Sequence, residues 1–98
     1  MPPKNIADLK KIVVPFAKNH NVNYIAVFGS FARGKAKKQS DIDLLVSFSK
    51  PISLLDLISM ELKLGEKMKK KVDLVTKKAL HPKIAKYIKK DLKILYEK

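Results

Sequence analysis

Two stretches decide the fold of this chain: VFGSFARG at residues 27–34 and SDIDLLV at residues 40–46. The first leads from a run of β-branched and aromatic residues into a Gly-Ser pair, which indicates a buried strand followed by a tight connection. In the second, apolar residues at 42, 44 and 46 alternate with Asp41 and Asp43. Because side chains alternate along a strand, both carboxylates share the face opposite these apolar residues. The stretches predict strands at 23–29 and 41–48.

Helical and strand patterns alternate along the rest of the chain. Asn5 caps a helix that ends in a turn at 19–21, and Pro15 is expected to kink or shorten that helix. Further expected elements are a short helix from Ser30 within the connection 29–38, a helix at 54–65, a strand at 71–76, a helix at 82–90 that buries Ile84, Ala85 and Ile88, and a strand at 92–96. This order predicts an α/β (α+β) fold, a small mixed β-sheet of about four strands with helices packed mainly on one face.

Composition restricts the class of protein. The 98 residues suit a single domain spanning 1–98, and the absence of cysteine excludes disulfides and thiolate zinc sites. No apolar run is long enough for a membrane span and no secretory signal is evident, so the expectation is a cytoplasmic protein that makes no use of a membrane. The net charge of +13 suggests a polyanionic partner, although lysine-rich surfaces also serve solubility or thermal stability.

Three aspartates stand in otherwise apolar strand patterns. Asp41 and Asp43 share one strand face, and Asp73 stands in the pattern KVDLV at 71–75. Neighbouring carboxylates repel each other unless a cation lies between them, and Mg²⁺ prefers a few carboxylates together with substrate phosphate oxygens. These residues are candidate metal ligands. The alternative is that they lie on a solvated sheet face.

Gly29 and Ser30 follow directly after a predicted strand. Glycine permits close backbone approach, and free N–H groups at a helix start favour phosphate oxygens. Arg33, in the same connection, could neutralise phosphate charge. By itself the Gly-Ser pair also fits an ordinary turn, and the stretch is not a Walker A loop.

Taken together, Gly29-Ser30, Asp41-Ile42-Asp43 and the later Asp73 resemble the signature of the DNA polymerase beta nucleotidyltransferase superfamily, in its minimal (MNT) branch. The resemblance covers nearly the whole chain and implies the nucleotidyltransferase fold. It also implies that Asp41 and Asp43 bind two Mg²⁺ ions and that Asp73 completes the metal site on the acceptor side. By the same resemblance, Gly29 and Ser30 hold the β- and γ-phosphates of an NTP.

The minimal branch resembles MntA-like antitoxins, which transfer AMP from ATP to a tyrosine of a HEPN-type RNase toxin. The resemblance therefore implies a Mg²⁺-dependent adenylyltransferase with ATP as substrate and a helical HEPN-type partner. Alternatives are nucleotidyl transfer to a small molecule or an RNA end, and a non-catalytic module that binds a partner or nucleic acid. Apolar positions such as Leu57 and Ile58 could also support a homo-oligomer.

Overall fold

The computed structural model describes residues 2–35 and 40–98, so residues 36–38 of the expected connection lie outside it. Within the described residues the elements follow in the order α1 Ile6–Asn19, β1 Val22–Phe28, α2 Gly29–Ala32, β2 Ile42–Phe48, α3 Leu54–Met68, β3 Val72–Thr76, α4 Pro82–Ile88 and β4 Lys93–Glu97. The strands form one sheet in the order β3-β2-β1-β4. β2 and β3 are parallel, and β1 is antiparallel to both β2 and β4. The expected mixed sheet of four strands is confirmed.

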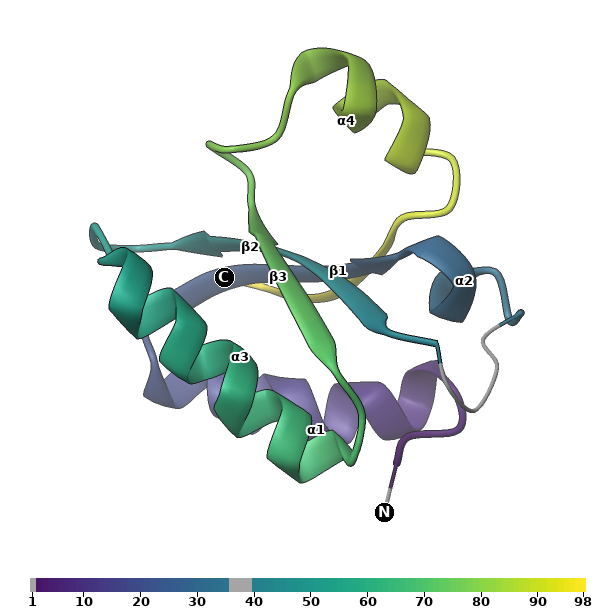
Figure 1. Cartoon of the computed structure of the whole chain (residues 1–98), viewed down its shortest axis with the longest axis horizontal. Coiled ribbons are helices and arrows are strands. Elements are labelled where there is room, and N and C mark those ends of the chain that lie inside the picture. The colour runs from purple at the N-terminus through teal and green to yellow at the C-terminus, as the bar shows by residue number, and fades with distance from the viewer. Residues whose placement is uncertain (1, 36–39) are drawn as a thin grey trace.

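The sheet has two unequally covered faces. Figure 1 shows α1 and α3 below the sheet and α4 above it. The larger apolar cluster lies on the α1 and α3 side, where Leu9 and Val13 of α1 and Leu64 and Met68 of α3 pack against the strands. A smaller cluster on the other side is made by Tyr24, Ala26, Leu45 and Ile88. The expectation that helices pack mainly on one face therefore holds, with α4 as the exception.

Side-chain caps define the beginnings of α1 and α3. The Asn5 side chain accepts a hydrogen bond from the Asp8 N–H, and the Ser53 hydroxyl accepts one from the Asp56 N–H. α3 runs one turn beyond the expected end at Gly65, because the buried Leu64 and Met68 hold that turn against the core. It ends where Lys69 adopts a left-handed conformation. In the part of the chain that the structure describes, every helix is too short or too polar to cross a membrane.

Pro15 does not shorten α1, so that part of the prediction is wrong. The helix continues for four residues after the proline, to Asn19. Pro15 itself is exposed, whereas Phe16 and Ala17 are buried against the sheet. The carbonyl that the proline leaves without a helical partner therefore faces the solvent side, and packing of the buried residues holds the last turn.

α4 is shorter and less buried than the sequence suggests. It ends at Ile88, and Ile88 is its one buried residue, with Ala85 half-buried and Ile84 54% exposed. The expected burial of Ile84 is therefore wrong. A helix of two turns that covers a small apolar cluster can direct only a few side chains towards the sheet. The helical pattern in the sequence does not show how much of the sheet the helix covers.

Candidate active site

The strand register brings two of the three aspartates side by side. Asp43 lies opposite Asp73 in the parallel β2–β3 pair and opposite Phe28 in the antiparallel β1–β2 pair. Leu45, two residues after Asp43, packs in the cluster beneath α4. Because residues two apart on a strand share a face, Asp43 and Asp73 lie on the sheet face that α4 covers. The pair stands where β1 leads into α2.

Gly29 joins the two sequence stretches in space. Its φ of +75° is the left-handed conformation that glycine adopts most readily, and a Cβ at this position would lie 2.5 Å from Oδ2 of Asp43. Only a glycine lets the backbone pass this close to the carboxylate. Ser30 follows in the first turn of α2 and is half-buried. The start of the connection after β1 thus lies directly against the Asp43 carboxylate of β2.

The carboxylates disturb one another. Burial, followed by the charges of Asp73 and Asp41, raises the pKa of Asp43 above its ordinary value. Asp41, just before β2, lies with Oδ2 4.0 Å from Nζ of Lys71, just before β3. A cation shared by the carboxylates would relieve their repulsion.

The donor set fits a hard divalent cation. It consists of carboxylate oxygens, which are the protein ligands that Mg²⁺ prefers. Across residues 2–35 and 40–98, no group of three or more His, Cys, Asp or Glu side chains is arranged to hold a metal ion. Asp41 lies beside the Lys71 ammonium, which a metal ion bound at Asp41 would have to replace. The assignment of Asp41, Asp43 and Asp73 as metal ligands stays a prediction.

Arg33 has a partner of its own. It is the C-terminal cap residue of α2, and its Nη1 donates to Oδ2 of Asp91 at 3.3 Å. This ion pair ties the connection after β1 to the segment between α4 and β4. Both side chains are partly exposed, so a phosphate could compete for the guanidinium. The prediction that Arg33 binds nucleotide stays open.

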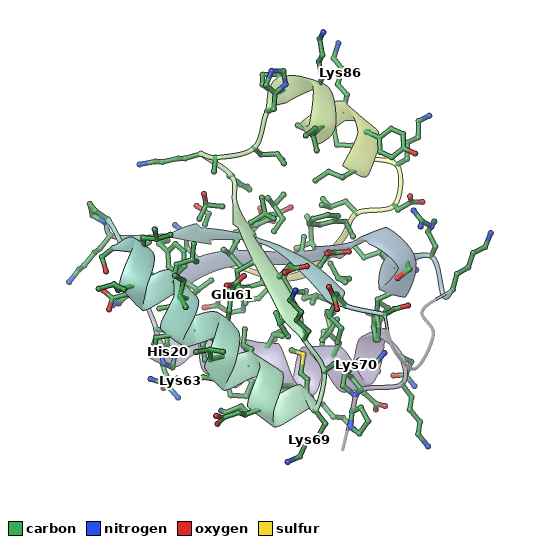
Figure 2. The ribbon with its side chains drawn as sticks, viewed as in Figure 1. His20, Glu61, Lys63, Lys69, Lys70 and Lys86 are labelled. Carbon is green, nitrogen blue, oxygen red and sulfur yellow. The ribbon has the colours of Figure 1, made fainter. Side chains whose placement is uncertain are left out.

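Two supporting residues escaped the sequence analysis. Lys71 faces Asp41 because the parallel register pairs Ile42 with Val72, the residues that follow them. Glu61 of α3 accepts a hydrogen bond from the backbone N–H of Leu74, next to Asp73, at 2.7 Å. Figure 2 shows Glu61 on the side of α3 that faces the sheet. Finding Lys71 from the sequence would have required knowing that 41–48 and 71–76 pair in parallel. Sequence alone does not give a strand register.

Two cavities lie away from the carboxylates. One of about 270 Å³ and one of about 500 Å³ are both lined by Phe48, Lys50 and Ile52, beyond the far end of β2. Asp43 and Phe48 are separated by roughly 17 Å of strand. The two cavities therefore lie at one end of β2, and the carboxylates lie at the other. We assign the candidate site to the carboxylates, because volume alone brings no reactive group.

Comparison with known proteins gives a consistent result. A protein-family model described as "Polymerase beta, Nucleotidyltransferase" matches residues 10–98. A Methanocaldococcus jannaschii relative whose name places it among the protein adenylyltransferases is 42% identical over 94 residues, which cover 91% of this chain and 96% of that protein. The protein adenylyltransferase MntA of Thermococcus cleftensis is 44% identical over 71 residues, 72% of each chain.

Solved structures share the fold. A minimal nucleotidyltransferase structure aligns with a TM-score of 0.79 at 30% identity, covering 95% of both chains. A toxin–antitoxin structure with AMP-PNP aligns with a TM-score of 0.81 at 20% identity, covering 91% of this chain and 73% of the other. A complex of the tri-AMPylated Shewanella oneidensis HEPN toxin with its MNT antitoxin aligns with a TM-score of 0.75 at 17% identity, covering 95% and 73%. The last two likenesses concern the fold alone.

Proposed function

This chain belongs to the polymerase beta nucleotidyltransferase family, and on that premise we propose that it transfers AMP from ATP to a hydroxyl group of a partner protein with Mg²⁺ as cofactor. The names of the relatives that cover most of the chain support protein as the acceptor class. The AMP groups on the HEPN toxin of a structural neighbour support a HEPN-type RNase as the partner. We propose a tyrosine of such a protein as the acceptor.

One observation carries the proposal: the backbone at Gly29 passes so close to the Asp43 carboxylate that a Cβ would lie 2.5 Å from Oδ2. A triphosphate held at Gly29 and Ser30 would therefore have its phosphorus atoms beside the carboxylates. Asp41 and Asp43 are proposed to hold two Mg²⁺ ions, with Asp73 as a further ligand, and Arg33 is proposed to exchange Asp91 for a phosphate oxygen. Their arrangement would bring phosphate, cation and acceptor to the same point.

The proposed reaction is one displacement at phosphorus. The acceptor hydroxyl oxygen forms a bond to the α-phosphorus, the bond from that phosphorus to the oxygen bridging to the β-phosphorus breaks, and pyrophosphate leaves. Asp73 is proposed to take the hydroxyl proton, because it lies beside Asp43 in the strand register and β3 forms an edge of the sheet. Bound divalent cations would supply neutralisation of phosphate charge and a lowered pKa of the acceptor hydroxyl.

Nucleotide binding tests the first half of the proposal. Calorimetric titration of the chain with ATP, GTP, CTP and UTP, each with and without Mg²⁺, should show metal-dependent binding that is strongest for ATP. The double variant Asp41→Asn/Asp43→Asn should lose it. Strong binding of every nucleotide by that variant in the presence of chelator would contradict the site.

Transfer tests the second half. The chain is incubated with ATP labelled at the α-phosphate and a HEPN-type protein encoded beside it. Label should appear on the partner and map to a tyrosine, and the Asp41→Asn/Asp43→Asn variant should not label it. If that variant neutralised the RNase undiminished, stoichiometric binding would replace catalysis as the mechanism. Label on RNA ends or on a small molecule would instead support the other acceptor classes.

A further inference from the structure

The segment that contains α4 concentrates positive charge. Residues 77–93 hold seven of the chain's 22 cationic residues, namely Lys77, Lys78, Lys83, Lys86, Lys89, Lys90 and Lys93. Asp91 is the one acidic residue in this segment, and its carboxylate is engaged by Arg33. Figure 2 shows Lys86 on the side of α4 turned away from the sheet. A cationic surface thus surrounds α4.

Large apolar side chains are exposed within the same surface. Ile84 and Tyr87 of α4 are 54% and 74% exposed. Ile94 of β4 is 48% exposed and pairs with Ala26, so it lies on the sheet face that α4 covers. Apolar residues with a charged rim are typical of protein interfaces, and tyrosine is enriched among the residues that carry their binding energy. We call Ile84, Tyr87, Ile94 and the seven lysines the α4 surface.

The α4 surface adjoins the candidate active site. Ile88 of α4 packs in the cluster that contains Leu45. Asp43 precedes Leu45 by two residues on the same face, roughly 7 Å along the strand. The ion pair between Arg33 and Asp91 links the other end of this segment to α2. A protein seated on α4 would therefore lie within side-chain reach of the carboxylates.

We propose that the α4 surface is the docking site for the acceptor protein, and that the acceptor binds it with an acidic face that carries apolar residues. The inference rests on the proposed function, because it assigns a partner surface to the same site. Docking there would hold the acceptor hydroxyl next to the carboxylates. Positive potential around α4 also steers an acidic partner towards the site.

Two features favour an acidic protein over RNA. The cations of the α4 surface are all lysines, whereas arginine provides the planar bidentate contacts that read bases. Its apolar residues include two isoleucines, which a protein interface buries. The exposed apolar residues of α3, such as Leu55 and Leu62, lie across the sheet from the carboxylates and cannot present an acceptor to them.

Matched pairs of variants test the proposal. Ile84→Ser/Tyr87→Ser removes exposed apolar side chains from the α4 surface, and Leu55→Ser/Leu62→Ser removes comparably exposed ones from α3. The measured quantity is the dissociation constant for the HEPN-type protein encoded beside the chain. The α4 variant should bind at least 10-fold more weakly and the α3 variant within 2-fold of the unmodified chain.

A second pair tests the charge. Lys83→Glu/Lys86→Glu should weaken the complex at least 10-fold and should reduce its salt dependence, while Lys10→Glu/Lys11→Glu on α1 should not. All four variants should bind Mg²⁺-ATP as the unmodified chain does, which shows that they are folded and that the nucleotide site is intact.

The outcomes separate docking from chemistry. Equal binding by the α4 and control variants, or no complex at about 100 μM protein, would overturn the α4 surface as a docking site. Complex formation through α4 without AMP transfer would leave the docking site standing and contradict the proposed function. Sub-micromolar binding of a labelled 20-nucleotide single-stranded RNA that the α4 variants lose, with protein binding unchanged, would assign the surface to nucleic acid and overturn the proposal.

Discussion

Gly29 occupies the place where the backbone after β1 comes nearest to the Asp43 carboxylate. Two constraints act there together, a positive φ and a contact that leaves no room for a Cβ. Gly34 shares the first constraint, with a φ of +71°, but among the described residues beyond its two chain neighbours no atom lies within 4 Å of its Cβ position. The two glycines therefore separate the cost of the conformation from the cost of crowding the carboxylate.

We predict that Gly29→Ala lowers the affinity for Mg²⁺-ATP at least 10-fold and costs about 1–3 kcal/mol of stability. The added methyl group would displace the Asp43 side chain from its position. Gly34→Ala should cost about 1 kcal/mol, from the strained φ alone, and leave nucleotide affinity within 3-fold. Calorimetric titration and urea denaturation measure both quantities, and equal affinities for the two variants would contradict the role given to Gly29.

The raised pKa of Asp43 makes the stability of the metal-free chain depend on pH. Between the ordinary pKa of an aspartate and the raised one, the native state binds more protons than the unfolded chain. Stability therefore falls as pH rises through that interval, and the unfavourable contribution is fully present above the raised pKa. Asp43→Asn removes it.

We predict that Asp43→Asn raises the melting temperature at pH 7 in chelator by about 1–4 °C, a small effect because the carboxylate is only half-buried. The gain should narrow towards pH 4. Added Mg²⁺ should stabilise the unmodified chain and not the variant, because only the former binds the ion in its native state. Melting curves with and without Mg²⁺ check both effects. The control for loss of a charge is Glu66→Gln, at an exposed position of α3. A lower melting temperature for Asp43→Asn in chelator would refute the prediction.

At the scale of elements, β3 is an edge strand that carries a site residue. Its neighbour is β2 on one side only, and on its free side the N–H of Leu74 donates to the Glu61 carboxylate of α3. This hydrogen bond fixes α3 to the strand at the residue beside Asp73. It also occupies a backbone donor that a foreign strand could otherwise pair with.

We predict that Glu61→Ala costs about 1–2 kcal/mol of stability and weakens Mg²⁺ binding by a few-fold, because β3 loses its attachment next to Asp73. Glu61→Gln keeps an acceptor oxygen and should lose less than half as much. Glu66→Ala, on the same helix and exposed, should stay within about 0.5 kcal/mol of the unmodified chain. Urea denaturation ranks the three variants, and the same loss for Glu61→Gln as for Glu61→Ala would show that packing, not the hydrogen bond, is responsible.

The whole molecule carries its charge on a small body. The net charge of +13 is distributed over a molecule of 33 × 31 × 23 Å. Most pairs of charges are then closer than a few Debye lengths at low salt. Repulsion among the like charges therefore destabilises the folded state more than it destabilises the expanded unfolded chain.

We predict that raising the ionic strength from about 20 to about 300 mM increases the melting temperature by roughly 2–5 °C, because screening relieves this repulsion. Measurements with chloride and with a second monovalent anion separate screening from specific anion binding. A melting temperature that falls with salt would mean that favourable ion pairs outweigh the net repulsion.

Local patterns in the sequence were sufficient for much of the fold. The capped helix after Asn5, the Gly-Ser turn and the alternation through Asp41 and Asp43 each depend on residues close in the chain, and the structure contains all of these elements. The predicted helix ends that failed, at Gly65 and Lys90, depend on what packs against the last turn of each helix. The periodicity of a sequence shows which residues share one face of a helix. It does not show which surface packs against that face.

Tertiary structure alone decided how the site is assembled. The parallel register of β2 and β3 placed Asp73 beside Asp43 and Lys71 beside Asp41, and helix packing brought Glu61 to β3 and Asp91 to Arg33. The sequence identified the three aspartates as chemically unusual, because a charge in an apolar strand is destabilising unless it is paired or binds a metal ion. The distances between these aspartates, and the ion pair that Lys71 makes with Asp41, come from segments about 30 residues apart in the chain. The energy that pairs those segments is shared by the whole sheet, so no single stretch of sequence reveals it.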